Sequence, residues 1–508
     1  MDVAPSGHAK EHREPGPLSA LARLPSYPWL VVGTVCIGAF MGQLDASIAQ
    51  LVLPTLQATF KASLPDVSWI ALGYLLVLAA TLPIFGRLAD IFGRKILYTG
   101  GFLIFILGSA LCGFAPSLAF LIGARVLQAL GAGLLQANSV AIITAAAGPE
   151  RRGRAIGVQG AAQAIGLSLG PALGGLLIQA IGWRWVFWIN VPAGIVGTIL
   201  GWFVLPRTQG LRHDERGFDW WGATLLTPTL ALILLALSEV SSWGATSPAF
   251  VISILGGFVL LATFVWHERH AKPPLVDLDL FRSHAFSAGN AAGLISYGLL
   301  FGVFLLLPFA LERGYSDSPF AAGLRLTAIP LALGIAAPLS GAFSDRLGPR
   351  PLTFAGMLLA AISLAVLAFS LNGSAQTLPL LTAMLILFGV GQGLFTAPNN
   401  SAIMGAAPNH RLGAAGGVLN VTRTLGTSLG VAIASALLAW RIDAFPGIAR
   451  TTLNAPPHEL LAGIRDVLYL FAFLAVAAAL ISLLRGKPPS IDPRSRKQIE
   501  AYEPIGGV

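Results

Sequence analysis

Fourteen apolar runs, each long enough to cross a membrane as a helix, follow one another along the chain. A helix needs about 20 apolar residues to span the hydrocarbon core. Such runs lie near 28–53, 67–86, 96–114, 117–144, 154–180, 186–205, 219–238, 248–267, 285–311, 319–340, 351–371, 377–401, 412–439 and 465–484. Only 11% of the residues are charged, against about 25% in soluble domains. The sequence therefore predicts an all-α, polytopic membrane protein.

Lysine and arginine are distributed unevenly between the two sides of these predicted spans. The side that holds both termini carries twenty-three of them, and the opposite side carries only Lys61, Arg184, Arg313, Arg441 and Arg450. Because cytoplasmic loops collect Lys and Arg, we expect both termini in the cytoplasm. This topology also explains the formal net charge of +9, so a nucleic-acid partner is not indicated.

The second half of the sequence repeats the first. "GRLADIFGRK" (86–95) returns as "GAFSDRLGPR" (341–350), and "SLG" at 168–170 returns at 428–430. Chance similarity between Gly/Ala-rich helices is the alternative. A duplication gives two six-helix halves, 28–205 and 285–484, joined by a linker with two extra spans (206–284) and flanked by cytoplasmic tails (1–27 and 485–508). Two such halves can rock about a site near the midplane, so we expect a solute transporter.

The turn between the second and third spans carries a charged motif. Gly86 and Gly93 free the backbone to turn and helices to approach closely, while Asp90 is placed to pair with arginines or a helix N-terminus. The decapeptide resembles the G-x-L-a-D-x-x-G-r-k signature of the major facilitator superfamily, which implies a latch that closes the cytoplasmic side. The implied latch residues are Gly86, Asp90, Gly93, Arg94, Lys95, Asp345 and Arg350. A charged turn that merely follows the positive-inside bias is the alternative.

The fifth span reads "GVQGAAQAIGLSLGPALGG" (157–175). Glycines at four-residue spacing open a groove for a neighbouring helix, and a proline inside a helix removes one backbone hydrogen bond. The pattern is similar to the antiporter signature of the superfamily, which implies export. It comprises Gly157, Gly166, Gly170, Pro171, Gly174 and Gly175. Generic small-residue packing is the alternative.

An aspartate, Asp45, interrupts the first apolar run, where an ionised carboxylate costs about 2.5–3.5 kcal/mol. Arg125 lies in the fourth span, and at 1.5 Å per residue both residues sit roughly 12–14 Å below the outer end. We therefore expect an ion pair. "LDASIAQLVLP" (44–54) resembles a motif of fourteen-span drug:proton antiporters, and "RVLQALGAG" (125–133) resembles the superfamily's R-x-x-Q-G-x-G motif. These resemblances imply proton coupling through Asp45 and Arg125; purely structural roles are the alternatives.

The sequence leaves open which residues border a substrate cavity. Gln43, Ser47 and Gln50 share one face of the first span and Asp45 points nearly opposite, so either face can border it. The polar candidates elsewhere are Gln128, Gln136, Asn138, Gln163, Asn399 and Arg423. Such residues serve equally well as interhelical hydrogen-bond partners. Arg423 occupies the repeat position of Gln163, where it would repel cations.

The resemblance implies a monomeric, proton-coupled exporter in the inner membrane of a bacterium. It would move small lipophilic compounds, neutral or monocationic, by alternating access, with proton and substrate occupying Asp45 in turn. A proton-coupled symporter, or an exporter of one metabolite or antibiotic, is the alternative. A membrane-embedded enzyme would need clustered His, Asp, Glu, Ser or Cys within the spans, so neither catalysis nor a cofactor or metal is expected.

Overall fold

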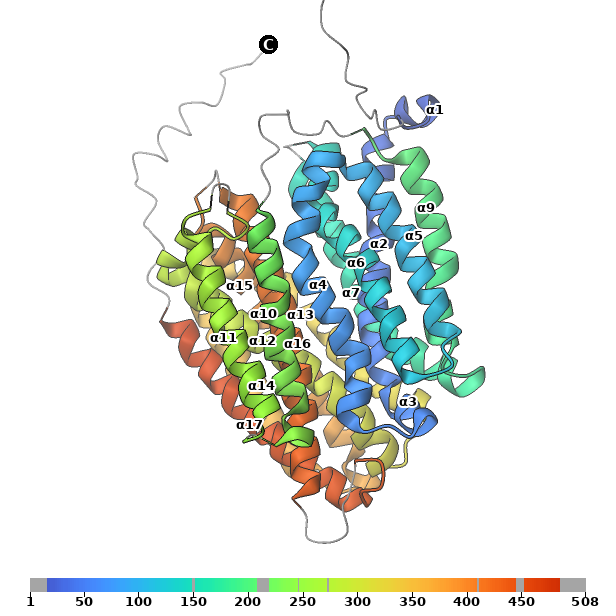
Figure 1. Cartoon of the computed structure of the whole chain (residues 1–508), viewed down its shortest axis with the longest axis vertical. Coiled ribbons are helices and arrows are strands. Elements are labelled where there is room, and N and C mark those ends of the chain that lie inside the picture. Colours follow the sequence, from blue (N-terminus) through green and yellow to red (C-terminus); the bar gives the residue numbers. More distant parts are fainter. Residues whose placement is uncertain are drawn as a thin grey trace, which may run out of the picture.

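The computed structural model describes residues 16–148, 151–207, 219–244, 246–271, 274–408, 411–444 and 452–484. Within these ranges the regular elements are all helical, and fourteen helices are long and apolar enough to span a membrane. They coincide with the fourteen predicted runs, so the all-α, fourteen-span class is confirmed. Figure 1 shows the helices gathered into two bundles that lie side by side.

The first bundle contains the helices of the N-terminal half. Its spans are α2 (Tyr27–Leu51), α4 (Leu64–Phe92), α5 (Arg94–Gly113), α6 (Leu118–Ala147), α7 (Arg152–Ala180) and α9 (Asn190–Val204). The short helices α1 (Ser19–Ala22), α3 (Leu53–Phe60) and α8 (Trp185–Trp188) complete it. Within this bundle α2 packs along α7, and α6 packs against both α4 and α5.

The second bundle contains the helices of the C-terminal half. Its spans are α12 (His284–Phe309), α13 (Pro319–Leu347), α14 (Pro349–Ser370), α15 (Leu378–Gly405), α16 (Leu412–Asp443) and α17 (Pro457–Leu483). A π-helical turn, η4 (Ala310–Gly314), extends α12, and a 3₁₀ turn, η5 (Ala375–Thr377), precedes α15. In this bundle α13 and α14 both pack against α15, and α12 packs against α16.

Two further spans lie between the bundles in the sequence. These are α10 (Trp220–Trp243) and α11 (Pro248–Glu268), followed by the 3₁₀ turn η3 (Leu278–Arg282). They pack against each other, and α10 also contacts α4 and α16 (Figure 1). The indole Nε1 of Trp69 on α4 donates to Glu239 Oε1 on α10 at 2.9 Å. The inserted pair therefore covers one of the two seams between the bundles.

The last span begins earlier than the sequence predicts. The apolar run suggested 465–484, whereas α17 begins at Pro457, a residue type favoured at the first helical position. Its first turns contain charged residues, and Asp466 Oδ2 accepts a hydrogen bond from Arg441 Nε of α16 at 2.6 Å. Hydropathy detects only the apolar part of a helix, which explains the difference.

The two bundles meet at the end of the molecule that carries α3, here called the α3 end. Gln57 Nε2 of α3 donates to Thr452 Oγ1 at 2.7 Å, and the hydroxyls of Ser68 on α4 and Ser435 on α16 are 2.8 Å apart. The opposite end carries the turn between α4 and α5 and is called the α4–α5 end. The α3 end is thus bridged by side chains of both bundles.

Backbone contacts between α7 and α13 close the same end. A Cβ added to Gly175 would collide with the Pro319 carbonyl oxygen, and one added to Gly323 would collide with the Pro171 carbonyl oxygen. Only glycine allows two helices to approach this closely. The bundles are therefore sealed against each other at the α3 end.

Candidate transport site

A buried ion pair lies in the middle of the first bundle. Arg125 Nη1 of α6 is 2.6 Å from Asp45 Oδ2 of α2, and the two side chains are 1% and 0% exposed. The structure therefore brings together the two residues that sequence motifs singled out. Removing two charges from water costs several kcal/mol per ion, and a buried pair persists only when further hydrogen bonds satisfy it.

Both carboxylate oxygens of Asp45 are satisfied by side chains of the bundle. Gln128 Nε2 and Asn190 Nδ2 donate to Oδ1 at 2.9 and 3.2 Å, while Oδ2 accepts from Arg125. The guanidinium also donates from Nη1 to Gln128 Oε1 at 2.6 Å and from Nε to the Ile70 carbonyl at 3.1 Å. The ion pair is thus held by α2, α4, α6 and α9 together.

The cavity between the bundles has a volume of about 860 Å³. Its wall is formed by α2, α4, α5, α6 and α7 of the first bundle and by α12, α13, α15 and α16 of the second. On α7 the wall runs from Leu169 to Gly157, and on α13 from Leu331 to Gly341, so it extends from mid-helix toward the α4–α5 end. This volume suits a drug-sized molecule.

The ion pair does not border this cavity. Asp45, Arg125 and Gln128 are absent from the wall, but Tyr74 belongs to it, and the Arg125 guanidinium lies 4.2 Å from the centre of the Tyr74 ring. Direct competition of proton and substrate for Asp45, expected from the sequence, therefore does not fit this conformation. Tyr74 separates the charge pair from the cavity.

The orientation of α2 answers a question that the sequence left open. Gln43 and Ala46 belong to the cavity wall, whereas Asp45 faces the interior of the first bundle. Ser47 and Gln50, which share a face with Gln43, are buried. Since a Cβ on Gly170 would collide with Ser47 Oγ, this part of α2 packs on α7 instead of bordering the cavity.

Three of the six predicted cavity residues, Gln136, Gln163 and Arg423, lie in the wall. The other three are buried hydrogen-bond partners: Gln128 holds Asp45, Asn138 donates to the Leu134 carbonyl at 2.8 Å, and Asn399 donates to the Gly289 carbonyl at 3.2 Å. These three therefore do not border the cavity in this conformation and act as interhelical or intrahelical hydrogen-bond partners, because sequence alone does not fix the direction in which a polar residue of a buried helix points.

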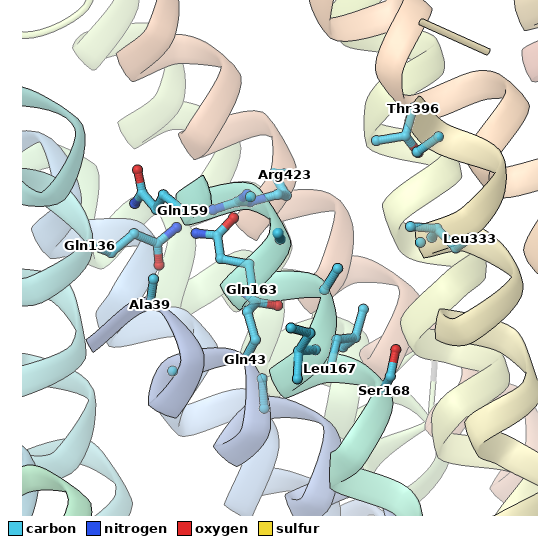
Figure 2. Close-up of a pocket in the computed structure, with 18 of the residues that line it drawn as sticks. Ala39, Gln43, Gln136, Gln159, Gln163, Leu167, Ser168, Leu333, Thr396 and Arg423 are labelled. Atoms are coloured by element: carbon cyan, nitrogen blue, oxygen red, sulfur yellow. The ribbon is translucent and has the colours of Figure 1, made fainter. Parts of the chain in front are cut away.

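Figure 2 shows polar side chains gathered at one part of the otherwise mostly apolar wall. Arg423 of α16 points toward Gln159 and Gln163 of α7, and Gln136 of α6 lies beside them (Figure 2). Gln159 also belongs to the wall, and its four-residue spacing from Gln163 places both amides on one helical face. Among the described residues that line the cavity, Arg423 is the only charged one.

The glycine-rich face of α7 packs against two different helices. An added Cβ on Gly166 would collide with Phe40 of α2, and one on Gly174 would collide with Ile48 of the same helix, so that both glycines face α2 as Gly170 does. An added Cβ on Gly175 would instead collide with α13. A Cβ on Gly157 would meet open space, and Gly157 lines the cavity. The motif thus shapes the α2–α7 contact, the α7–α13 seam and part of the wall.

The α4–α5 turn contains the predicted latch. Gly93 joins α4 directly to α5 with φ of 103°, and Gly348 occupies the repeat position with φ of 77°, a region that favours glycine. A Cβ on Gly86 would meet nothing within 4 Å, so the expected close helix approach at Gly86 is not present. The side chains of Asp90 and Asp345 lie outside the described residues.

The described residues contain no group of three or more His, Cys, Asp or Glu that could hold a metal ion. What they do form is a one-sided cavity between two similar membrane-spanning bundles. Two similar bundles around a central cavity are the architecture of a secondary solute transporter.

The family model described as Major Facilitator Superfamily matches residues 35–431 and 289–505. The chain therefore belongs to the major facilitator superfamily and is a membrane transporter of small molecules, not an enzyme.

Curated relatives of the chain are named transporters and resistance proteins. The riboflavin transporter RibZ of Clostridioides difficile is 38% identical over 81% of this chain and 88% of its own length. The multidrug resistance protein B homolog of Mycobacterium tuberculosis is 35% identical over 81% and 76%. The tetracenomycin C resistance and export protein of Streptomyces glaucescens is 31% identical over 82% and 78%.

A solved structure with the same fold is a bacterial homologue of the human lysosomal transporter Spinster, in an inward-facing and unoccupied conformation. It superposes with a TM-score of 0.67 at 17% identity and covers 91% of this chain and 97% of that chain. At this identity the likeness shows the fold alone.

Proposed function

We propose that the protein exports small lipophilic compounds in exchange for protons, with Asp45 as the proton-binding group and Arg125 as its partner. The main support is the fully buried pair of Asp45 and Arg125. Only the ring of Tyr74 lies between this pair and the central cavity. Ionisable residues inside a membrane protein mark functional pathways by default. Relatives named as resistance and export proteins support the outward direction.

The proposed orientation puts the α4–α5 end and both termini in the cytoplasm of a bacterium, as the Lys/Arg bias predicts. The cavity then opens inward. The moving bodies are the halves 28–205 and 285–484, with 206–284 as linker and 1–27 and 485–508 as cytoplasmic tails. A single chain holds the complete site, so a monomer suffices.

Coupling runs through Tyr74 and α2. When Asp45 binds a proton, Arg125 loses its counter-charge, and the guanidinium that lies against Tyr74 must find new partners. Tyr74, Gln43 and Ala46 all line the cavity, so a rearranged ion pair changes the wall that the substrate touches. Proton and substrate thus compete through conformation, because each favours a different arrangement of the first bundle.

The switch in access follows from the two ends of the molecule. In the outward-open state the α7–α13 contacts at Gly175 and Gly323 separate, and the bundles meet at the α4–α5 end. There Arg94 and Lys95 of the first bundle and Arg350 of the second, with Asp90 and Asp345, form the proposed latch. Glycine contacts that seal one end and a charged turn that seals the other make the two states mutually exclusive.

An accumulation panel in cells tests export. Cells that express the protein should retain less of at least one lipophilic dye or antibiotic than cells without it, and a protonophore should remove the difference. Asp45→Asn should abolish this protection, while Asp443→Asn, at an exposed position, should leave it intact. Equal accumulation of every compound in both cell lines, or full protection by Asp45→Asn, would contradict the proposal.

A second candidate is the transport of one metabolite, and the relative named riboflavin transporter favours it. The amide-bearing wall suits a planar compound rich in carbonyl groups. Riboflavin is fluorescent, so its uptake and release by the same cells can be followed directly. Movement of riboflavin with no effect on any other compound would select this candidate over a broad exporter.

A further inference from the structure

Arg423 brings an uncompensated positive charge to the cavity. It belongs to the wall, which includes no Asp or Glu among the described residues. The part of the chain that the structure describes offers its guanidinium neither an ion pair nor a hydrogen bond. Asp45, which is fully buried, is already bound to Arg125. The charge of Arg423 is therefore available to a molecule inside the cavity.

Three glutamines surround this charge from the opposite bundle. Gln136, Gln159 and Gln163 lie around the end of the Arg423 side chain (Figure 2); with Arg423 they form what we call the Arg–Gln subsite. Gln159 Nε2 donates to Ser139 Oγ at 2.8 Å, whereas the amides of Gln136 and Gln163 have no side-chain partner among the described residues. Polar side chains of both bundles thus meet at one place in the cavity wall.

The depth of the subsite decides which ligands can reach it. Gln163 and Arg423 each lie eleven residues after the first residue of their helix, which is about 16 Å along the axis. That position is near the middle of the hydrocarbon core, well below a lipid headgroup. A ligand there must be a soluble or lipophilic compound inside the cavity.

The chemistry of the subsite decides the charge of its ligand. A guanidinium presents donors in a planar fork that matches carboxylates and other oxyanions, and its hydrogen bonds to an ionised acceptor are about twice as strong as neutral ones. Low polarity of the surrounding wall strengthens this attraction. A cation would meet repulsion and find no carboxylate. Monocationic substrates were expected from the sequence, but the described residues of this wall include no carboxylate that would bind a cation.

We propose that the Arg–Gln subsite binds the anionic oxygen group of a lipophilic organic anion, such as a carboxylate, phenolate or enolate. Arg423 takes the charge, the glutamines donate to neighbouring oxygens, and the apolar wall, which includes Phe301, Leu333 and Ile335, holds the hydrophobic body. This inference rests on the proposed function, because it takes the cavity as the substrate site. It narrows the substrate class from lipophilic compounds in general to lipophilic anions.

The test compares two dyes that differ in charge and share one ring system. Fluorescein methyl ester is a monoanion at mildly alkaline pH, and the matching rhodamine methyl ester is a monocation. Binding to the purified full-length protein in detergent is followed by fluorescence anisotropy. Wild type should bind the anion at least tenfold more tightly. Arg423→Gln should weaken anion binding about tenfold, in line with hydrogen bonds to charged groups, and Arg423→Lys should recover part of it.

A second variant leaves Arg423 untouched and keeps the test decisive if Arg423→Gln fails to fold. Gln163→Glu supplies a carboxylate opposite the guanidinium, so it should weaken anion binding and strengthen cation binding. Arg282→Gln, at an exposed surface arginine, is the matched control and should bind both dyes as wild type does. Equal or absent binding of the two dyes by wild type, or an unchanged ratio in Gln163→Glu, would overturn the inference.

Failure of the proposed function gives a different result. The binding assay contains no membrane and no gradient, so it does not depend on proton coupling. A protein that prefers the anion in detergent but never lowers cellular accumulation of any compound contradicts the export proposal alone. A protein that exports by protons yet prefers the cation contradicts the anion inference alone.

Discussion

At the scale of single residues, the buried Asp45 carboxylate is stabilised by the side chains that donate hydrogen bonds to it. Arg125, Gln128 and Asn190 all donate to this carboxylate, and none of these side chains is more than 1% exposed. A buried pair is strongly destabilised when one partner is removed, but replacing both partners is often neutral. We therefore expect the pair to add little net stability, which is consistent with the proposal that its role is to bind the coupled proton.

The paired substitutions Asp45→Asn and Arg125→Gln test this expectation. Arg125→Gln alone should lower the free energy of unfolding by about 3–5 kcal/mol, because it leaves a buried charge unpaired. The double variant should be markedly more stable than Arg125→Gln. Thermal unfolding of the purified proteins in detergent measures this, and purely additive effects of the two substitutions would show that the residues do not interact.

The sequence predicted that Asp45 and Arg125 pair, but it did not predict the residues that hydrogen-bond to the pair. Depth along two helices was enough to bring Asp45 and Arg125 to one level, because helical rise is constant. The role of Asn190 could not be found in this way, since it is 145 residues from Asp45 and no motif marks it. Gln128 was assigned to the cavity because spacing gives the face of a helix but not what that face touches.

At the scale of elements, α7 links the two bundles and also packs on the helix that carries Asp45. Its glycines contact α2 on one side and α13 on the other, so a shift of α2 reaches the seam through one rigid helix. The sequence predicted a groove for a neighbour from the glycine spacing. It could not tell that two neighbours share the motif, because glycine has no side chain whose character would reveal its partner.

Substitutions of single glycines on α7 should show what each of these contacts does. Gly175→Ala forces a methyl group against the Pro319 carbonyl, and overpacking of this kind costs about 1–3 kcal/mol, so it should weaken the closed α3 end. A cysteine placed at Ser68, in a background with Cys36 and Cys112 replaced by alanine, should then react faster with an impermeant thiol reagent outside the cell.

The matched control is Gly157→Ala, where an added methyl meets open space. This variant should label at the rate of the unsubstituted background. If Gly175→Ala labels no faster than Gly157→Ala, the α7–α13 seam does not hold the α3 end closed.

At the scale of the whole molecule, fourteen spans and the duplication follow from hydropathy and repeat spacing, and both were visible in the sequence. The cavity was not, because its shape depends on how two bundles tilt against each other. The proposed exchange of an anionic substrate for a proton has an energetic consequence. Export of a monoanion against entry of one proton moves two charges with the membrane potential, each contributing about 2.3 kcal/mol per 100 mV.

This charge balance predicts a voltage dependence. Export of fluorescein methyl ester from energised cells should slow more than export of a neutral lipophilic dye when valinomycin and external potassium collapse the potential. The initial rates of both dyes give the comparison. An equal slowing of the two would mean that the exported species carries no negative charge.

The central claim is that Asp45 carries the coupled proton, and substrate-driven proton flux tests it most directly. Proteoliposomes with a trapped pH-sensitive dye are exposed to a compound that the wild-type protein exports. Wild type and Asp443→Asn should move protons across the membrane when the compound is added. Asp45→Asn should still transport the compound down its concentration gradient, but without proton movement. Proton flux of wild-type size in Asp45→Asn would contradict the account.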